Sequence, residues 1–148
     1  MSKNSALVCD DTPANLDFLE RLLTQAGFAV FGAPNGKTAI DYLRASDDLK
    51  LAVIDMELPD TNGLQLTQDI RQHFPDACIV VATVHDDRLL MESVRNKGGN
   101  VFLVKPHGFM ELFKRLSANR LEKMRDGGFL VIDQYGPRVM SKSKARLG

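Results

Sequence analysis

The chain has 148 residues, enough for one compact domain with a single core and too few for two ordinary domains. Its 19 basic residues equal its 19 acidic residues, so the overall charge predicts neither a nucleic-acid partner nor a membrane partner. No apolar stretch approaches the roughly 20 residues that span a bilayer, and the first residues lead directly into a strand-like run, so we expect a cytoplasmic protein without a membrane segment.

Five short apolar runs recur along the chain. They contain almost no polar residues, which is typical of strands buried on both faces of a parallel sheet. In chain order the runs cover residues 6–9, 28–31, 51–54, 78–82 and 101–104. Cys9 and Cys78 lie inside two of these runs, so we expect free thiols that pack as small apolar side chains.

Between the runs, the apolar residues change to the spacing of a helix. The first helical segment places Leu16, Leu19 and Leu22 on one face and ends at Gly27. Four further helical segments cover residues 35–45, 63–74, 86–97 and 108–124. Five repeats of strand and helix predict a three-layer α/β/α sandwich, because right-handed crossovers place helices on both faces of a parallel sheet.

Polar residues follow four of the five predicted strands. Asp10-Asp11 follow the first strand, Asp55 the third, Thr83 the fourth and Lys105 the fifth. A single aspartate after a strand would be explained most simply as a cap of the next helix. Four such positions at the carboxyl ends of parallel strands meet at one edge of the sheet and indicate a functional site.

The acidic residues of this edge suggest a metal site. Three carboxylates within about 4–6 Å repel one another by several kcal/mol, so they need a cation. All-oxygen ligands suit Mg²⁺. A metal-bound carboxylate beside a lysine suits phosphoryl transfer, because cations neutralise the charge on the equatorial oxygens. We therefore expect Asp55 to attack, Mg²⁺ to bind Asp11 and Asp55, and Lys105 to pair with the phosphoryl group.

The chain resembles the response-regulator receiver domains of two-component systems. The matching segments are VCDD (8–11), VIDMELPDTNG (53–63), VVAT (80–83) and FLVKP (102–106), in the order and spacing of that family. The resemblance implies a flavodoxin-like fold with a five-stranded parallel sheet of strand order 2-1-3-4-5. It also implies a receiver domain over residues 1–125 and a C-terminal extension over residues 126–148.

The resemblance assigns the acidic residues. Asp55 is implied to be the phosphoacceptor and, with Asp11, a direct Mg²⁺ ligand. Asp10 is implied to act mainly through metal-bound water, and Glu57 through its backbone carbonyl.

The resemblance also implies a conformational switch. Thr83 and Phe102 match the hydroxyl and aromatic switch positions of the family: a phosphoryl oxygen would draw the Thr83 hydroxyl towards it, and Phe102 would move into the vacated space. Pro106 would follow a cis peptide bond that aims Lys105 at the site. The family usually has alanine or glycine after the threonine, whereas this chain has the bulkier Val84.

The function implied is that of a phosphorylation-activated response regulator, not itself an enzyme. Its phosphoryl group would come from a sensor histidine kinase or a phosphotransfer protein. Two alternatives stay open: a pseudo-receiver that binds partners without phosphorylation, and a phosphatase in which Glu57 would be the general acid beside an aspartyl nucleophile.

The expected output is contact with a downstream protein, and a homodimer is possible. No helix-turn-helix, zinc motif or GxGxxG occurs, so we expect no direct binding of nucleic acid. The surface of the fourth helix, fifth strand and fifth helix is the expected docking site, because it adjoins Thr83 and Phe102.

Residues 126–148 lie outside the resemblance. Gly127-Gly128 should end the last helix, residues 129–132 form a strand-like run, and residues 135–137 are a turn signal followed by a basic end over 141–146. A parallel return beside the fifth strand would need a left-handed crossover, so we expect the run on a helical surface, on the opposite edge or on a second subunit. Deleting residues 127–148 should leave Asp55 phosphorylation intact and weaken self-association or partner binding.

Overall fold

The computed structural model describes residues 4–106 and 108–140. The predicted alternation of strands and helices is confirmed, and one helix and two strands are added to it. In chain order the elements are β1 (Ser5–Cys9), α1 (Pro13–Gln25), β2 (Ala29–Ala33), α2 (Gly36–Arg44), β3 (Leu51–Asp55), α3 (Gly63–His73), β4 (Cys78–Thr83), α4 (Arg88–Asn96), β5 (Val101–Val104), α5 (Gly108–Ser117), α6 (Leu121–Asp126), β6 (Leu130–Asp133) and β7 (Gly136–Val139). The basic end predicted over residues 141–146 lies outside the described residues.

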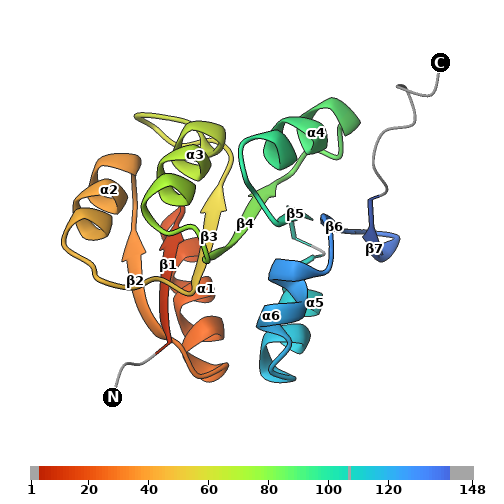
Figure 1. Cartoon of the computed structure of the whole chain (residues 1–148), viewed down its shortest axis with the longest axis horizontal. Helices are drawn as coiled ribbons and strands as arrows, with labels where there is room; N and C mark the ends of the chain where they lie inside the picture. The colour runs from red at the N-terminus through yellow and green to blue at the C-terminus, as the bar shows by residue number, and fades with distance from the viewer. Residues whose placement is uncertain (1–3, 107, 141–148) are drawn as a thin grey trace.

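The elements form three layers around one sheet (Figure 1). The strand order is β2-β1-β3-β4-β5-β6-β7, so the expected order 2-1-3-4-5 is confirmed and continues for two more strands. β1 to β6 pair in parallel, and β7 pairs with β6 in the antiparallel direction. α1, α5 and α6 lie on one face of the sheet and α2, α3 and α4 on the other.

The central strands are buried on both faces, which explains their uninterrupted apolar sequences. Alternate residues of each strand enter two apolar clusters: Leu7 and Cys9 face α2, α3 and α4, whereas Ala6 and Val8 face α1 and α5. Both cysteines are free, as predicted, and burial raises the pKa of each thiol to about 12. These thiols are therefore neutral core groups at pH 7.

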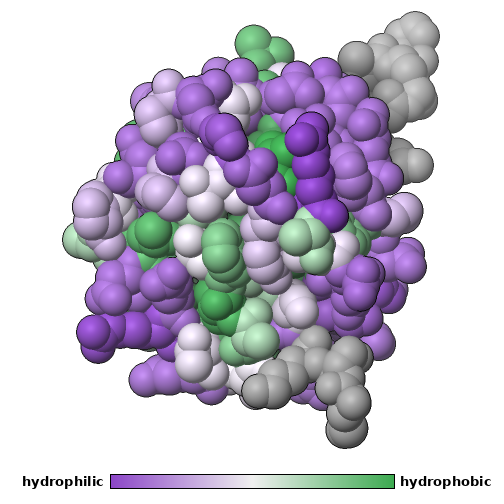
Figure 2. All heavy atoms as spheres, turned by 90° about the vertical axis from the view of Figure 1, so that its left-hand side faces the viewer, coloured by the Kyte–Doolittle hydropathy of each residue, from purple (hydrophilic) through white to green (hydrophobic). Residues whose placement is uncertain are grey.

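The two edges of the sheet are protected differently. Figure 2 faces the β2 edge, where apolar side chains lie between hydrophilic ones. There Phe31 of β2 stacks on Tyr42 of α2, with ring centroids 4.3 Å apart. At the other edge, the N–H of Met140 donates to the carbonyl of Phe129 on β6. In an antiparallel pair, successive residues of a strand point their N–H groups alternately towards and away from the partner strand. Pro137 occupies one of the positions that point away from β6, and proline has no N–H to present there. The missing donor at Pro137 weakens β7 as a template for further strands.

The helix predicted over residues 108–124 is two helices. α5 ends at Ser117 and α6 begins at Leu121. Asn119 between them has φ of 60°, a left-handed conformation that asparagine tolerates better than most residues and that ends a helix. The predicted end of the last helix at Gly127-Gly128 is confirmed. No helix within residues 4–106 and 108–140 is long and apolar enough to cross a bilayer.

The position expected for the strand-like run of the extension is wrong. β6 pairs in parallel with β5, with Phe102 opposite Val131. α5 lies on the same face as α1, where the rings of Phe18 and Phe109 are 5.9 Å apart, so the connection from β5 to β6 has the rare left hand. The pairing satisfies the backbone groups along β5 and buries Leu130 and Val131, which together favour it over the usual hand.

A network of hydrogen bonds holds the β5-to-β6 connection in place at the amino ends of the strands. The Arg71 guanidinium donates to the Gly98 carbonyl and, at 2.6 Å, to Asn100 Oδ1. Asn100 Nδ2 in turn donates to the carbonyl of Arg125, the residue before the end of α6. The network joins α3, the start of β5 and α6, and so fixes where the chain turns back into the sheet.

Candidate functional site

Three carboxylates meet at the carboxyl edge of the sheet. Asp10 and Asp11 follow β1, and Asp55 is the last residue of β3. One oxygen of each carboxylate lies within 4.8 Å of the others. Asp10 and Asp55 are buried, whereas Asp11 is exposed. The cluster is therefore open to solvent on the side of Asp11.

Lys105 reaches this cluster from the end of β5. Its Nζ lies 3.1 Å from Asp55 Oδ1 and 3.7 Å from Asp10 Oδ2. The backbone N–H of Lys105 donates to the carbonyl of Thr83, and the Lys105–Pro106 peptide bond is cis, as the resemblance implies. Among the described residues, the Lys105 ammonium is therefore the cation in contact with the buried carboxylates of Asp10 and Asp55.

Burial raises the pKa of the Asp55 carboxyl above its ordinary value. The Asp10 charge acts in the same direction, and the Lys105 ammonium opposes both through its charge and its hydrogen bond. The net direction is upward, so one lysine does not fully compensate the burial of these carboxylates. A further cation at this edge would lower the cost of keeping Asp55 ionised.

This pKa shift predicts a pH-dependent effect on stability. Folding raises the pKa of Asp55, so its contribution to stability is present below the ordinary aspartate pKa and is lost as pH rises through the folded pKa. In metal-free buffer, Asp55→Asn should therefore have a larger free energy of unfolding than the wild type at pH 7, and the difference should vanish in acid. Urea unfolding of both proteins between pH 4 and pH 7.5 measures this, and a difference independent of pH would contradict it.

The loop after Asp55 is held by specific contacts. Gly63 approaches the backbone so closely that a Cβ there would lie 2.8 Å from Met56 Cα and 2.9 Å from the Asp55 carbonyl oxygen. The Asp60 carboxylate accepts from the N–H groups of Gly36 and Lys37 at the start of α2, which lowers its pKa. The capping of the start of α2 by Asp60 was not predicted from the sequence. The sequence shows only an aspartate in a loop, and the start of α2 that it caps is distant in the chain.

Glu57 and His85 lie on the rim of the site. Their side chains are exposed, and His85 Nε2 lies 3.5 Å from Glu57 Oε2. Val84, the departure from the family pattern, is 61% exposed beside them. The predicted contribution of the Glu57 backbone carbonyl to a metal site stays a prediction.

Thr83 and Phe102 are both buried but lie in different surroundings. The Thr83 hydroxyl oxygen accepts from the backbone N–H of His85, 3.2 Å away, in the loop after β4. Phe102 has no exposed surface and belongs to the apolar cluster beside α4. Phe129 and Val131 of the extension belong to the same cluster, a contact that the sequence did not reveal.

The sequence-predicted residues therefore separate into three groups. Asp10, Asp11, Asp55 and Lys105 form one compact site. Thr83 ends the strand next to Asp55, and Glu57 lies on the rim. Phe102 is not in the site and faces the α4 side of the sheet. A compact site of this kind can bind a cation and accept an electrophilic group on an oxygen of Asp55.

Comparisons with known proteins identify the family of the chain. The family model described as response regulator receiver domain matches residues 6–117. The chain is 30% identical over 114 residues to the transcriptional regulatory protein HprR of Escherichia coli, covering 76% of this chain and 49% of that protein. It is 29% identical over 103 residues to a chemotaxis protein CheY homolog of Campylobacter jejuni, covering 68% of this chain and 79% of that protein.

Solved structures show the same fold. A CheY-like receiver domain protein from Methanospirillum hungatei superimposes with a TM-score of 0.74 at 22% identity, covering 86% of this chain and 100% of that one. A response regulator from Burkholderia pseudomallei, solved with a phosphorylated aspartic acid and a calcium ion, gives 0.69 at 25% identity, covering 81% of this chain and 72% of that one. The chain spans half or less of the first curated relatives that it matches.

Proposed function

The chain belongs to the response regulator receiver domain family of two-component systems, and from this premise we propose that Asp55 accepts a phosphoryl group in a reaction that requires Mg²⁺. The observation that carries the proposal is the position of Lys105, whose Nζ lies 3.1 Å from Asp55 Oδ1 beside the clustered carboxylates. An ionised carboxylate at a solvent-open edge, next to a fixed ammonium, is suited to attack a phosphorus atom.

The carboxylates fit a hard cation. Asp10, Asp11 and Asp55 offer only oxygen donors, which is the chemistry that Mg²⁺ prefers. In our proposal Asp11 and Asp55 bind it directly, Asp10 acts through its water, and Glu57 adds a backbone carbonyl. When bound, Mg²⁺ supplies the positive charge that the phosphoryl oxygens require.

Asp55 and Lys105 carry the transfer in this proposal. A bond forms between an Asp55 carboxylate oxygen and phosphorus while the bond from phosphorus to the donor breaks, and the leaving group departs with its electron pair. Lys105 pairs with the phosphoryl oxygens and balances their charge. The donor is a sensor histidine kinase or a phosphotransfer protein. The phosphorylated aspartic acid of the Burkholderia pseudomallei relative supports an acyl phosphate as the product.

The proposed output passes through Thr83 and Phe102. β5 is not available as a docking surface, because all four of its residues are buried and β6 covers its edge. Phe102 instead contacts the cluster that contains Phe129 and Val131, so a movement of its ring would reach α4 and β6. We therefore place the contact with a downstream protein on α4 and the β6–β7 hairpin.

Acetyl phosphate tests the proposal directly. With Mg²⁺, the intact mass of the chain should increase by one phosphoryl group, and EDTA should prevent the increase. Hydroxylamine should remove the label, because it cleaves acyl phosphates. Labelling that persists in EDTA would contradict the proposal, and a wild type that is never labelled would favour the pseudo-receiver alternative.

A further inference from the structure

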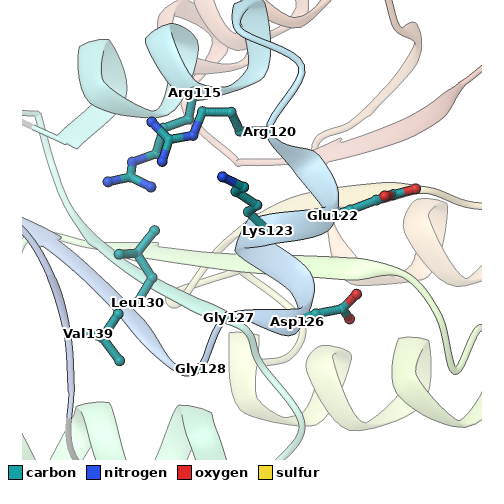
Figure 3. A pocket seen from close by; sticks show the side chains of 9 residues that line it. All are labelled: Arg115, Arg120, Glu122, Lys123, Asp126, Gly127, Gly128, Leu130 and Val139. Carbon is teal, nitrogen blue, oxygen red and sulfur yellow. The ribbon is translucent and has the colours of Figure 1, made fainter.

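A pocket lies at the opposite end of the sheet from the proposed phosphoacceptor site. It opens where α5, α6 and the β6–β7 hairpin meet, and its volume is about 450 Å³ (Figure 3). Leu130, one of its residues, pairs with Val101 at the amino end of β5, whereas Lys105 follows the carboxyl end of that strand. The two sites are therefore separated by the length of β5.

The pocket is positively charged on its helical side. Figure 3 shows Arg115, Arg120 and Lys123 extending into the same space from α5, the α5–α6 turn and α6. Arg115 uses its Nε to contact Glu111, 2.8 Å away. Within the ranges that the structure describes, no carboxylate lies within ion-pair distance of Arg120 or Lys123.

The acidic residues around the pocket do not cancel this charge. The carboxylates of Glu122 and Asp126 point away from the space that the three cations share. Asp126 is also held by the Arg125 guanidinium, through two contacts of 2.9 Å. Two cationic side chains are thus left to bind an anion, and the terminal guanidinium nitrogens of Arg115 are a third possible contact.

The opposite wall of the pocket is apolar. It is formed by Leu130 and Val139, which face each other across the β6–β7 hairpin. Val139 is 59% exposed, so its side chain is accessible from the pocket. Gly127 and Gly128 form the rim between the two walls and add no side chain that would fill the space.

We propose that this pocket binds a small organic phosphate, of the size of a nucleoside diphosphate. Its phosphate groups contact Arg120, Lys123 and Arg115, because guanidinium and ammonium groups are the usual partners of phosphate. Its ring system packs on the exposed side chain of Val139, beside the largely buried Leu130. The volume falls in the range of small-molecule sites, about 300–1,000 Å³. All of these residues except Arg115 follow residue 117, where the family match ends, so most of the site lies outside the matched region.

The test is isothermal titration calorimetry with ADP, pyrophosphate and adenosine, in EDTA so that phosphate does not bind through a metal. ADP should bind more tightly than either fragment. The variant Arg120→Gln/Lys123→Gln should weaken ADP binding by about tenfold or more. Val139→Ser should weaken ADP more than pyrophosphate, because it removes apolar surface and leaves the cations in place.

Lys114→Gln is the matched control, since Lys114 is a cation of α5 that does not line the pocket. It should bind ADP as the wild type does, and Asp55→Asn should do the same. Absence of ADP binding at millimolar concentration would overturn the proposal, as would equal weakening by Lys114→Gln. Equal affinity for pyrophosphate and ADP would reject the organic part of the ligand. None of these results bears on Asp55 labelling, so this proposal and the proposed function fail separately.

Discussion

Replacing Asp55 with asparagine is expected to abolish labelling of the chain by acetyl phosphate at any Mg²⁺ concentration. The amide keeps the shape of the side chain but removes the anionic oxygen that forms the bond to phosphorus. Lys105 Nζ lies closer to Asp55 than to Asp10, at 3.1 Å against 3.7 Å, so the lysine is better placed to assist transfer to Asp55 than to Asp10. Intact mass and peptide mapping after hydroxylamine treatment measure the result.

Lys105→Met and Asp17→Asn complete this experiment. Lys105→Met should retain slow labelling, reduced by about 100-fold or more, since it removes one charged contact from the transferred group. Asp17→Asn changes an exposed carboxylate on α1 that pairs with Arg21, so it should be labelled as the wild type is. Equal labelling of the Asp55→Asn variant would move the phosphoacceptor elsewhere and reject the mechanism.

Removing residues 127–148 is expected to unfold the domain or leave it strongly destabilised. Among the described residues, five buried apolar side chains would be lost: Phe129, Leu130, Val131, Ile132 and Met140. Each contributes about 1.5–3 kcal/mol when fully buried. Their sum is comparable with the whole stability of an ordinary domain, about 5–15 kcal/mol. The prediction made from sequence alone, that the truncated chain keeps its Asp55 phosphorylation, did not take the burial of these side chains into account.

The truncation also opens the edge of β5, so the shortened chain should aggregate during size-exclusion chromatography. Circular dichroism during heating measures the loss of stability. The matched control ends the chain after Met140 and keeps every described strand, so it separates the effect of losing the hairpin from that of losing residues 141–148. A chain without residues 127–148 that stays monomeric, folded and fully labelled would show that the hairpin is dispensable.

The parts of the fold that were predictable are those in which one local signal decides the structure. The buried strands have uninterrupted apolar runs because both of their faces are covered. The site residues were found from their positions after those strands, because parallel strands bring their carboxyl ends to one edge. Asp10, Asp55 and Lys105 meet there as the chain order requires.

The parts that sequence reasoning missed depend on contacts between distant segments. Nothing in the local sequence states that Asn119 will adopt a left-handed conformation and divide one helix into two. Parallel strands are usually joined by right-handed crossovers, and this preference argued against β6 pairing beside β5. In this chain the burial of residues 129–132 outweighs that preference. The basic pocket exists only because α6 and the hairpin are brought together by that pairing.

The order of the strands has a consequence for synthesis on the ribosome. From β3 to β7 each strand is added at the same side of the sheet in the order in which it leaves the ribosome, and only β2 lies on the other side. Each new strand therefore finds an edge that already exists, so the sheet can grow with translation. β7 is the last strand of the described residues, and Pro137 removes one of its outward N–H groups, so this edge is a weaker template for another strand.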